Sequence, residues 1–188
     1  MIRIETERLV IREFSISDAK DLNKIENQSH ILKWMPDFES TMNETITWIN
    51  WRMGQYLKYS KENPTLILGI TLKKTNKLIG FIGIDSKEEV NNETEVAYFI
   101  DNKHINRGYA TEASQAIINW IFKNSDIEFL MAIIQIGNQS SQRVIEKVGF
   151  EKLATKTLFV LGEKEDREFY YYRLYRDDYY CRSFEINK

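Results

Sequence analysis

The stretch TEVAYFIDNKHINRGYATEA, residues 94–113, joins a strand pattern directly to the start of a helix pattern. In the strand pattern, one face would carry Val96, Tyr98 and Ile100, and the other would carry Glu95, Ala97 and Phe99. This alternation predicts that Glu95 lies on one face of an otherwise apolar strand. An exposed edge position, a buried ion pair and a catalytic carboxylate would each explain such an acid. The strand alone leaves these alternatives open.

The helix pattern begins at Tyr109, so Arg107 and Gly108 fall at its first turn. The first four backbone amides of a helix have no acceptor within it and carry the positive end of the helix dipole. They bind phosphate groups where side chains leave the approach open. Gly108 and Ala110 leave it open, Arg107 adds a cation and Thr111 adds a hydroxyl. A pyrophosphate fits here, although a glycine at a helix start more often only closes a loop. The patterns GxxxxGK[ST] and GxGxxG of other nucleotide sites are absent.

Composition narrows the class of protein. The chain has 188 residues, 43% of them hydrophobic, which predicts a full-sized core in a single domain over residues 1–188. With 26 basic and 28 acidic residues the net charge is -2, so we expect neither nucleic acid nor a membrane as partner. A charged N-terminus and the absence of a long apolar run favour the cytoplasm. The lone Cys181 and two distant histidines, His30 and His104, predict no disulfide and no metal site, and we expect His104 on the surface.

The rest of the chain alternates strand and helix patterns without repeats or linkers, which predicts a mixed α/β fold. A first strand over residues 8–14 precedes a helix that Ser17 or Asp18 would cap. Residues 64–74 and 77–85 predict an antiparallel hairpin. Thr41 and Glu44 form a capping box before a second helix. Its expected core residues are Ile46, Trp48, Ile49, Trp51, Met53 and Tyr56.

A second motif, GNQSSQRVIEKVGFEK at residues 137–152, follows the apolar strand pattern EFLMAIIQI. Asn138 can cap a helix here, Gly149 suits its left-handed end, and Phe150 returns to the core. The pattern NxxSxRVxEKxGF, residues 138–150, resembles the signature of GNAT N-acetyltransferases of the RimJ/RimL type. Four further stretches agree with that family in order: ETERLVIREFSISDA at 5–19, LIGFIGI at 78–84, EVAYFI at 95–100 and RGYATEA at 107–113.

The resemblance spans roughly residues 5–178 and implies the GNAT fold, a member of the α/β (α+β) class. Its central, mostly antiparallel mixed sheet is flanked by helices and splayed between the fourth and fifth strands. It also implies acetyl-CoA as cosubstrate, with its pyrophosphate on the turn that precedes Tyr109. The implied coenzyme contacts are Phe99, Ile100, Asn106, Arg107, Gly108, Tyr109, Ala110, Thr111, Asn138, Ser141 and Arg143.

The implied reaction is direct transfer of the acetyl group to a primary amine. Only the neutral amine attacks a thioester, so a base is needed, and the resemblance gives this role to Glu95, acting directly or through a water. Ser141, with Asn138 nearby, would hydrogen-bond or protonate the departing CoA thiolate. Cys181 lies far from every motif, which disfavours a covalent enzyme intermediate.

Several positions depart from the family pattern. Asn106 stands where the loop commonly has glycine, Ile145 stands where other members place a tyrosine acid, and residues 157–161 contain no acid. Ser141 and Asn138 could also serve only as helix caps. The acidic turn GEKEDRE, residues 162–168, could attract a cationic amine or be simply solvated.

The leading acceptor, by resemblance, is a protein N-terminal α-amino group such as that of a ribosomal protein. A small amine is the first alternative, whether a polyamine, an amino acid or an aminoglycoside. A non-catalytic acyl-CoA-binding module and a nucleotide-binding protein are alternatives of a different class. We expect a monomer or a homodimer.

Overall fold

The computed structural model describes residues 1–62 and 64–185. Within these residues, eight strands form one sheet in the order β1-β2-β3-β4-β5-β6-β8-β7. Neighbouring strands are antiparallel except β5 and β6, which are parallel. The predicted mixed, mostly antiparallel sheet is therefore confirmed. The strands are β1 (Arg3–Glu5), β2 (Leu9–Arg12), β3 (Leu66–Leu72), β4 (Leu78–Lys87), β5 (Glu93–Ile100), β6 (Phe129–Gln135), β7 (Glu151–Val160) and β8 (Glu165–Tyr175).

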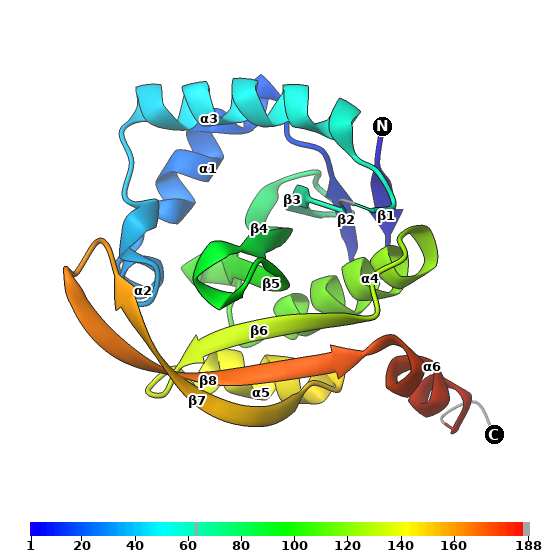
Figure 1. Cartoon of the computed structure of the whole chain (residues 1–188). Helices are drawn as coiled ribbons and strands as arrows, with labels where there is room; N and C mark the ends of the chain where they lie inside the picture. Colours follow the sequence, from blue (N-terminus) through cyan, green and yellow to red (C-terminus); the bar gives the residue numbers. More distant parts are fainter. Residues whose placement is uncertain (63, 186–188) are drawn as a thin grey trace.

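Helices cover both faces of this sheet (Figure 1). One hydrophobic cluster joins the sheet to α1 and α3, and a second joins the opposite face to α4 and α5. In the described part of the chain, no helix combines the length and apolar character needed to cross a bilayer. The helices are α1 (Ala19–Glu26), α2 (Ser29–Leu32), α3 (Met42–Gln55), α4 (Tyr109–Asn124), α5 (Gln139–Val148) and α6 (Arg176–Glu185); the 3-10 turn η2 (Pro36–Phe38) follows α2.

Strand β5 separates the two hydrophobic clusters, as its alternating sequence predicts. Val96 and Ile100 pack with α4 and α5, whereas Phe99 packs in the cluster of α1 and α3. Glu95 shares the face of Phe99, because side chains four residues apart in a strand point the same way. The carboxylate therefore lies on the α1–α3 face of the sheet.

The sheet opens between β5 and β6. On its other side β5 pairs with β4 at eight positions, from Gly80↔Ile100 to Lys87↔Glu93. Against β6 it pairs only once, at Glu95↔Met131. The two strands therefore meet at Glu95 and diverge beyond it, which confirms the predicted splay and leaves two strand edges facing each other across a wedge.

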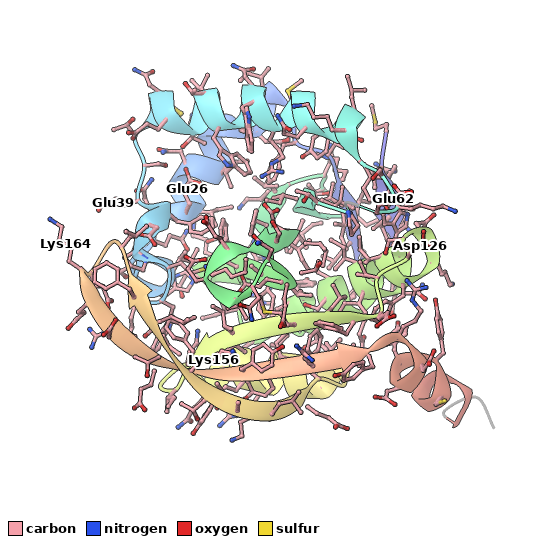
Figure 2. The ribbon with its side chains drawn as sticks, in the orientation of Figure 1. Glu26, Glu39, Glu62, Asp126, Lys156 and Lys164 are labelled. Carbon is pink, nitrogen blue, oxygen red and sulfur yellow. The ribbon has the colours of Figure 1, made fainter. Side chains whose placement is uncertain are left out.

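Strands β7 and β8 form a long hairpin whose tip lies beside α2 (Figure 1); Lys164 marks this tip in Figure 2. At the tip, Gly162 contacts η2 closely. A Cβ atom added there would lie 3.0 Å from Cβ of Pro36 and 2.6 Å from Oδ1 of Asp37. A larger residue would push the two segments apart, so glycine lets the hairpin rest against η2.

Several local predictions are confirmed. Thr41 and Glu44 form the capping box, with the amide of Thr41 donating to Oε2 of Glu44 at 2.7 Å. Strands β3 and β4 form the predicted antiparallel hairpin. The side chain of Asn138 accepts a hydrogen bond from the amide of Ser141 at 3.3 Å, and Gly149 ends α5 at a φ of 109°.

The prediction for the N-terminal segment is wrong in two respects. The expected strand over residues 8–14 is shorter, and it pairs with a separate strand, β1, across a turn in which the amide of Thr6 donates to the carbonyl of Leu9 at 3.0 Å. Neither Ser17 nor Asp18 caps α1 with its side chain. The carboxylate of Asp18 instead accepts two hydrogen bonds from Arg12, each 2.8 Å long. A bidentate, charge-assisted pair of this kind is stronger than a cap to a neutral amide.

The predicted buried stripe of α3 is also partly wrong. Trp51 and Met53 are 54% and 42% exposed. The helix buries Ile49, as predicted, and with it Thr45 and Arg52. Two of these three residues are polar and find partners only in the folded chain, so a search for apolar spacing passes over them.

Candidate active site

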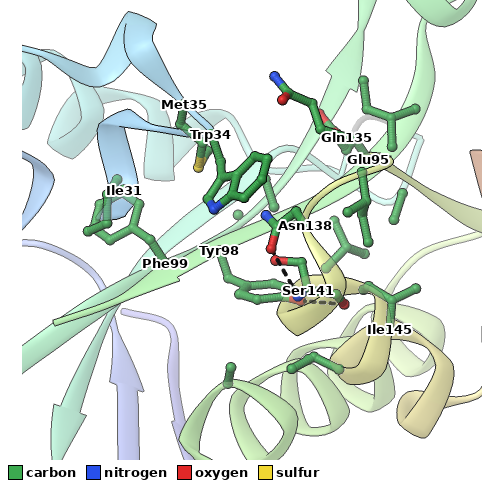
Figure 3. A pocket seen from close by; sticks show the side chains of 18 of the residues that line it. Ile31, Trp34, Met35, Glu95, Tyr98, Phe99, Gln135, Asn138, Ser141 and Ile145 are labelled. Atoms are coloured by element: carbon green, nitrogen blue, oxygen red, sulfur yellow. Dashed lines mark hydrogen bonds between the residues drawn. The ribbon is translucent and has the colours of Figure 1, made fainter. Parts of the chain in front are cut away.

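A cleft of about 900 Å³ occupies the wedge between β5 and β6. Its walls come from α2 and η2, from β5, from residues 104–111, from the start of α5 and from the β7–β8 hairpin (Figure 3). Most of the candidate residues line it, although they come from segments far apart in the sequence. These are Glu95, Phe99, Ile100, Asn106, Gly108, Tyr109, Ala110, Thr111, Asn138, Ser141 and Arg143.

The turn before α4 has the backbone geometry of an anion site. Gly108 is the N-cap with a φ of 77°, and no side chain caps the helix. The amide of Glu112 is the first to bond back into the turn, donating to the carbonyl of Gly108 at 3.0 Å. Asn106 also has a left-handed φ, 58°. Asparagine tolerates this region better than other residues with a Cβ, which explains how it replaces the family's glycine.

Arg8, in the turn between β1 and β2, holds this loop in place. Its Nε donates to Oε2 of Glu112 at 2.6 Å, and its Nη1 donates to the carbonyl of Arg107 at 2.9 Å. The guanidinium also lies 4.6 Å from the ring centre of Tyr109. Three contacts thus fix the chain on both sides of Gly108, at Arg107, Tyr109 and Glu112. No sequence pattern pointed to Arg8, because nearly one hundred residues separate it from the loop.

Two residues near the loop differ from expectation. Arg107 is exposed, and its side chain is not part of the cleft wall. His104, expected on the surface, has a side chain only 13% exposed and lines the cleft. Its Nε2 lies 3.9 Å from Oδ2 of Asp101. Burial nevertheless lowers the pKa of His104, which favours the neutral ring.

Glu95 sits at the point where β5 and β6 meet. Burial raises its pKa from 4.5 to about 7, because the surrounding apolar strands solvate a carboxylate poorly. The positive charge of Lys87 lowers the pKa of Glu95, but by less than burial raises it. A carboxyl group with a pKa near neutrality can accept a proton and release it again at physiological pH. This is the behaviour expected of a general base.

Ser141 and Asn138 have different roles at the start of α5. Asn138 is the helix cap; its Oδ1 accepts from the amide of Ser141 and, at 2.9 Å, from the hydroxyl of Ser140. Ser141 lines the cleft, and its side chain interacts with the hydroxyl of Tyr98. The carbonyl of Ser141 accepts a hydrogen bond from the hydroxyl of Tyr98 at 3.2 Å (Figure 3). Tyr98 thereby ties β5 to α5 across the wedge.

Phe99 and Ile100 are both buried, and their backbone forms the β5 edge of the wedge. His30, from α2, donates from Nε2 to the carbonyl of Ile100 at 3.0 Å. This bond fixes α2 to the same edge. The cleft thus combines an open helix N-terminus, the edges of β5 and β6 that do not pair with each other beyond Glu95, a near-neutral carboxyl and a serine hydroxyl. This set is suited to binding a phosphate-bearing thioester and moving protons.

Comparison with known proteins gives the class. Residues 8–151 match the family described as the acetyltransferase (GNAT) domain. The chain therefore belongs to the GNAT acetyltransferase family, and it is an acyltransferase that transfers acetyl groups to amines.

Two relatives cover nearly the whole chain. Uncharacterized N-acetyltransferase YnaD of Bacillus subtilis (strain 168) is 26% identical over 178 residues, which cover 95% of this chain and 99% of that protein. The crystal structure of the acetyltransferase (GNAT family) from Bacillus anthracis superimposes with a TM-score of 0.79 at 27% identity, covering 94% and 99% of the two chains. The fold also matches that of RimL, a ribosomal alpha-N-protein acetyltransferase in complex with coenzyme A. The TM-score is 0.78 at 15% identity, covering 94% and 99%.

Proposed function

We propose that the protein binds acetyl-CoA in the wedge between β5 and β6 and transfers its acetyl group to a protein N-terminal α-amino group. The observation that carries this proposal is the cleft that joins the open amides at the start of α4 to the carboxyl of Glu95. One domain, residues 1–188, would perform the whole reaction.

The turn before α4 would hold the pyrophosphate through backbone amides of residues 106–111. This choice is supported by the absence of a side-chain cap and by the two left-handed residues that turn the amides outward. The free strand edges of the wedge would accept the pantetheine arm near Phe99 and Ile100. Arg143 lines the cleft from α5, where its guanidinium would meet a phosphate.

The proton steps follow from the positions of Glu95 and Ser141. Glu95 would take a proton from the acceptor ammonium, directly or through a water, and the neutral amine would attack the thioester carbonyl carbon. A backbone amide of β5 would stabilise the resulting oxyanion. As the carbon–sulfur bond breaks, the Ser141 hydroxyl would hydrogen-bond or protonate the CoA thiolate. The first ammonium proton ends on Glu95 and returns to solvent. The second leaves the nitrogen as the amide forms, and it balances the proton that the thiolate receives, so that the Ser141 hydroxyl is restored.

The acceptor class is supported by likeness alone. RimL acts on the α-amino group of a ribosomal protein, as its description states, and it shares this fold. A small amine is the second candidate, because a cleft of about 900 Å³ has room for one beside the coenzyme arm. The acidic turn at residues 162–168 gives little support to a cationic acceptor, because Arg167 pairs with Glu163 at 2.6 Å and with Glu165 at 2.5 Å.

A panel of amines and N-terminal peptides, assayed for CoA release from acetyl-CoA, tests the proposal. The exposed Cys181 would react with thiol reagents, so the assay should use Cys181→Ser throughout. We expect turnover with at least one acceptor, a large loss in Glu95→Gln and a smaller loss in Ser141→Ala. Tight CoA binding without turnover on any acceptor would instead identify a binding module, and competition by ATP or NAD would indicate a nucleotide site.

A further inference from the structure

The part of the cleft on the α1–α3 face of the sheet has aromatic walls. Phe81 stacks on Phe99 with ring centroids 4.9 Å apart, and Phe38 packs edge-on against both, at 5.7 and 5.6 Å. Trp34 reaches from the end of α2 to the turn before α5, where a Cβ atom on Gly137 would lie 3.2 Å from its ring. We call the part of the cleft that these four aromatic side chains border the acceptor chamber; Glu95 lies on the same face of the sheet as Phe99.

One polar side chain enters this chamber from β6. Gln135 lies on the same face of β6 as Met131 and Ile133, because side chains two residues apart in a strand point the same way. This face is turned away from α4 and α5. Figure 3 shows its amide and the Trp34 ring reaching into the cleft from β6 and from the end of α2. The Nε2 of Gln135 is buried and has no hydrogen-bond partner among the described residues. A buried amide without a protein partner needs one from outside the chain, either a ligand or an ordered water.

Two acids along the cleft, Asp85 and Glu89, already have partners. Asp85 accepts hydrogen bonds from Thr65 at 3.1 Å and from the amide of Ser86 at 2.9 Å, and it lies 4.0 Å from Arg52. Glu89 lies 3.8 Å from Lys87. Asp37 is exposed at the rim, against the hairpin tip. The chamber therefore offers apolar surface and one amide rather than a second carboxylate for a polyamine.

We propose that Gln135 and Trp34 determine which acceptor is used. Gln135 hydrogen-bonds a carbonyl group next to the reacting amine, and Trp34 covers an apolar side chain on the same residue. This inference rests on the proposed function and narrows it. The preferred acceptor is an amino-terminal residue with an apolar side chain, and amines without a neighbouring carbonyl bind less well.

The test uses the full chain with acetyl-CoA and four acceptors. Leucine amide carries both recognised groups, glycine amide lacks the side chain, 3-methylbutylamine lacks the carbonyl, and spermidine carries extra charge. Each variant is compared with wild type on the same acceptor, so differences in amine pKa cancel. Acetyl-CoA affinity, measured by calorimetry, checks that each variant keeps its fold.

Gln135→Met keeps the length of the side chain and removes both polar atoms. We expect kcat/KM to fall about tenfold for the two amides and less than twofold for 3-methylbutylamine. Trp34→Ala should lower kcat/KM about tenfold for leucine amide and less than threefold for glycine amide, with Trp34→Phe in between. Gln115→Met, on the exposed side of α4, is the matched control and should leave kcat/KM unchanged for all four acceptors.

Equal losses on all four acceptors in Gln135→Met would show a purely structural role and overturn the proposal. Preference of the wild type for spermidine over leucine amide would overturn it as well. If amines are acetylated but the variants do not change kcat/KM selectively, the proposed function stands and only the selection by Gln135 and Trp34 is removed. Failure to acetylate any amine while acetyl-CoA still binds would remove both.

Discussion

Replacement of Glu95 by glutamine separates its chemical role from its effect on stability. The folded protein raises the pKa of this carboxyl from 4.5 to about 7, so the folded state holds a proton between these pH values that the unfolded state has released. The stability of the wild type should therefore fall as pH rises from 4.5 to 7. The difference corresponds to at most about 3 kcal/mol, and contact with solvent in the cleft reduces it to about 1–2 kcal/mol.

Glutamine has the same shape and does not ionise, so Glu95→Gln avoids this cost. At pH 8 we expect it to melt about 2–8 °C above the wild type, and at pH 4 the two should coincide. Wild-type kcat/KM should rise with an inflection near pH 7, because roughly a tenth of Glu95 is ionised at pH 6 and nine tenths at pH 8. The variant should retain only the rise that belongs to the acceptor amine. Equal melting temperatures at pH 8, or an unchanged inflection near pH 7, would refute the reasoning.

Three further predictions follow from the site. Arg8→Ala should raise KM for acetyl-CoA about five- to tenfold and change kcat less than twofold, because it frees the loop without touching the reacting atoms. The control is Arg3→Ala, which breaks a surface pair with Glu5. Equal changes of KM in the two variants would contradict the prediction. Tyr98→Phe should lower the free energy of unfolding, measured by chemical denaturation, by about 1 kcal/mol, and it should lower kcat several-fold because Ser141 loses its hydrogen bond to β5. An unchanged kcat would show that Tyr98 only fills space. Gly149→Ala should lower stability by about 1–2 kcal/mol because alanine resists its φ of 109°, and a melting temperature within 1 °C of wild type would be inconsistent with that strain.

Much of the candidate site was predictable because its signals are local. Strand alternation placed Glu95 and Phe99 on one face, and the preferences of helix ends placed Asn138 and Gly149. These rules involve residues at most a few positions apart, so they hold before the chain folds.

The remainder depends on contacts that only the topology creates. Arg8 and Glu112 are 104 positions apart, and no spacing rule joins them. Arg52 is buried because Trp48, Trp51 and Asp85 surround its guanidinium. The burial of His104 likewise follows from the packing of its loop beside the wedge. A polar residue that is buried by distant partners leaves no apolar pattern in the sequence. The predicted buried face of α3 was partly wrong for this reason.

The contact between Gly162 and η2 has a consequence for how a substrate arrives. The hairpin rests on Pro36 at the rim of the cleft, which narrows the approach of a folded surface to Glu95. An extended tail, by contrast, can be threaded beneath the hairpin from its free end. Under the proposed function, a polypeptide would therefore be modified while its first residues are unstructured, and lysines embedded in folded surfaces would escape.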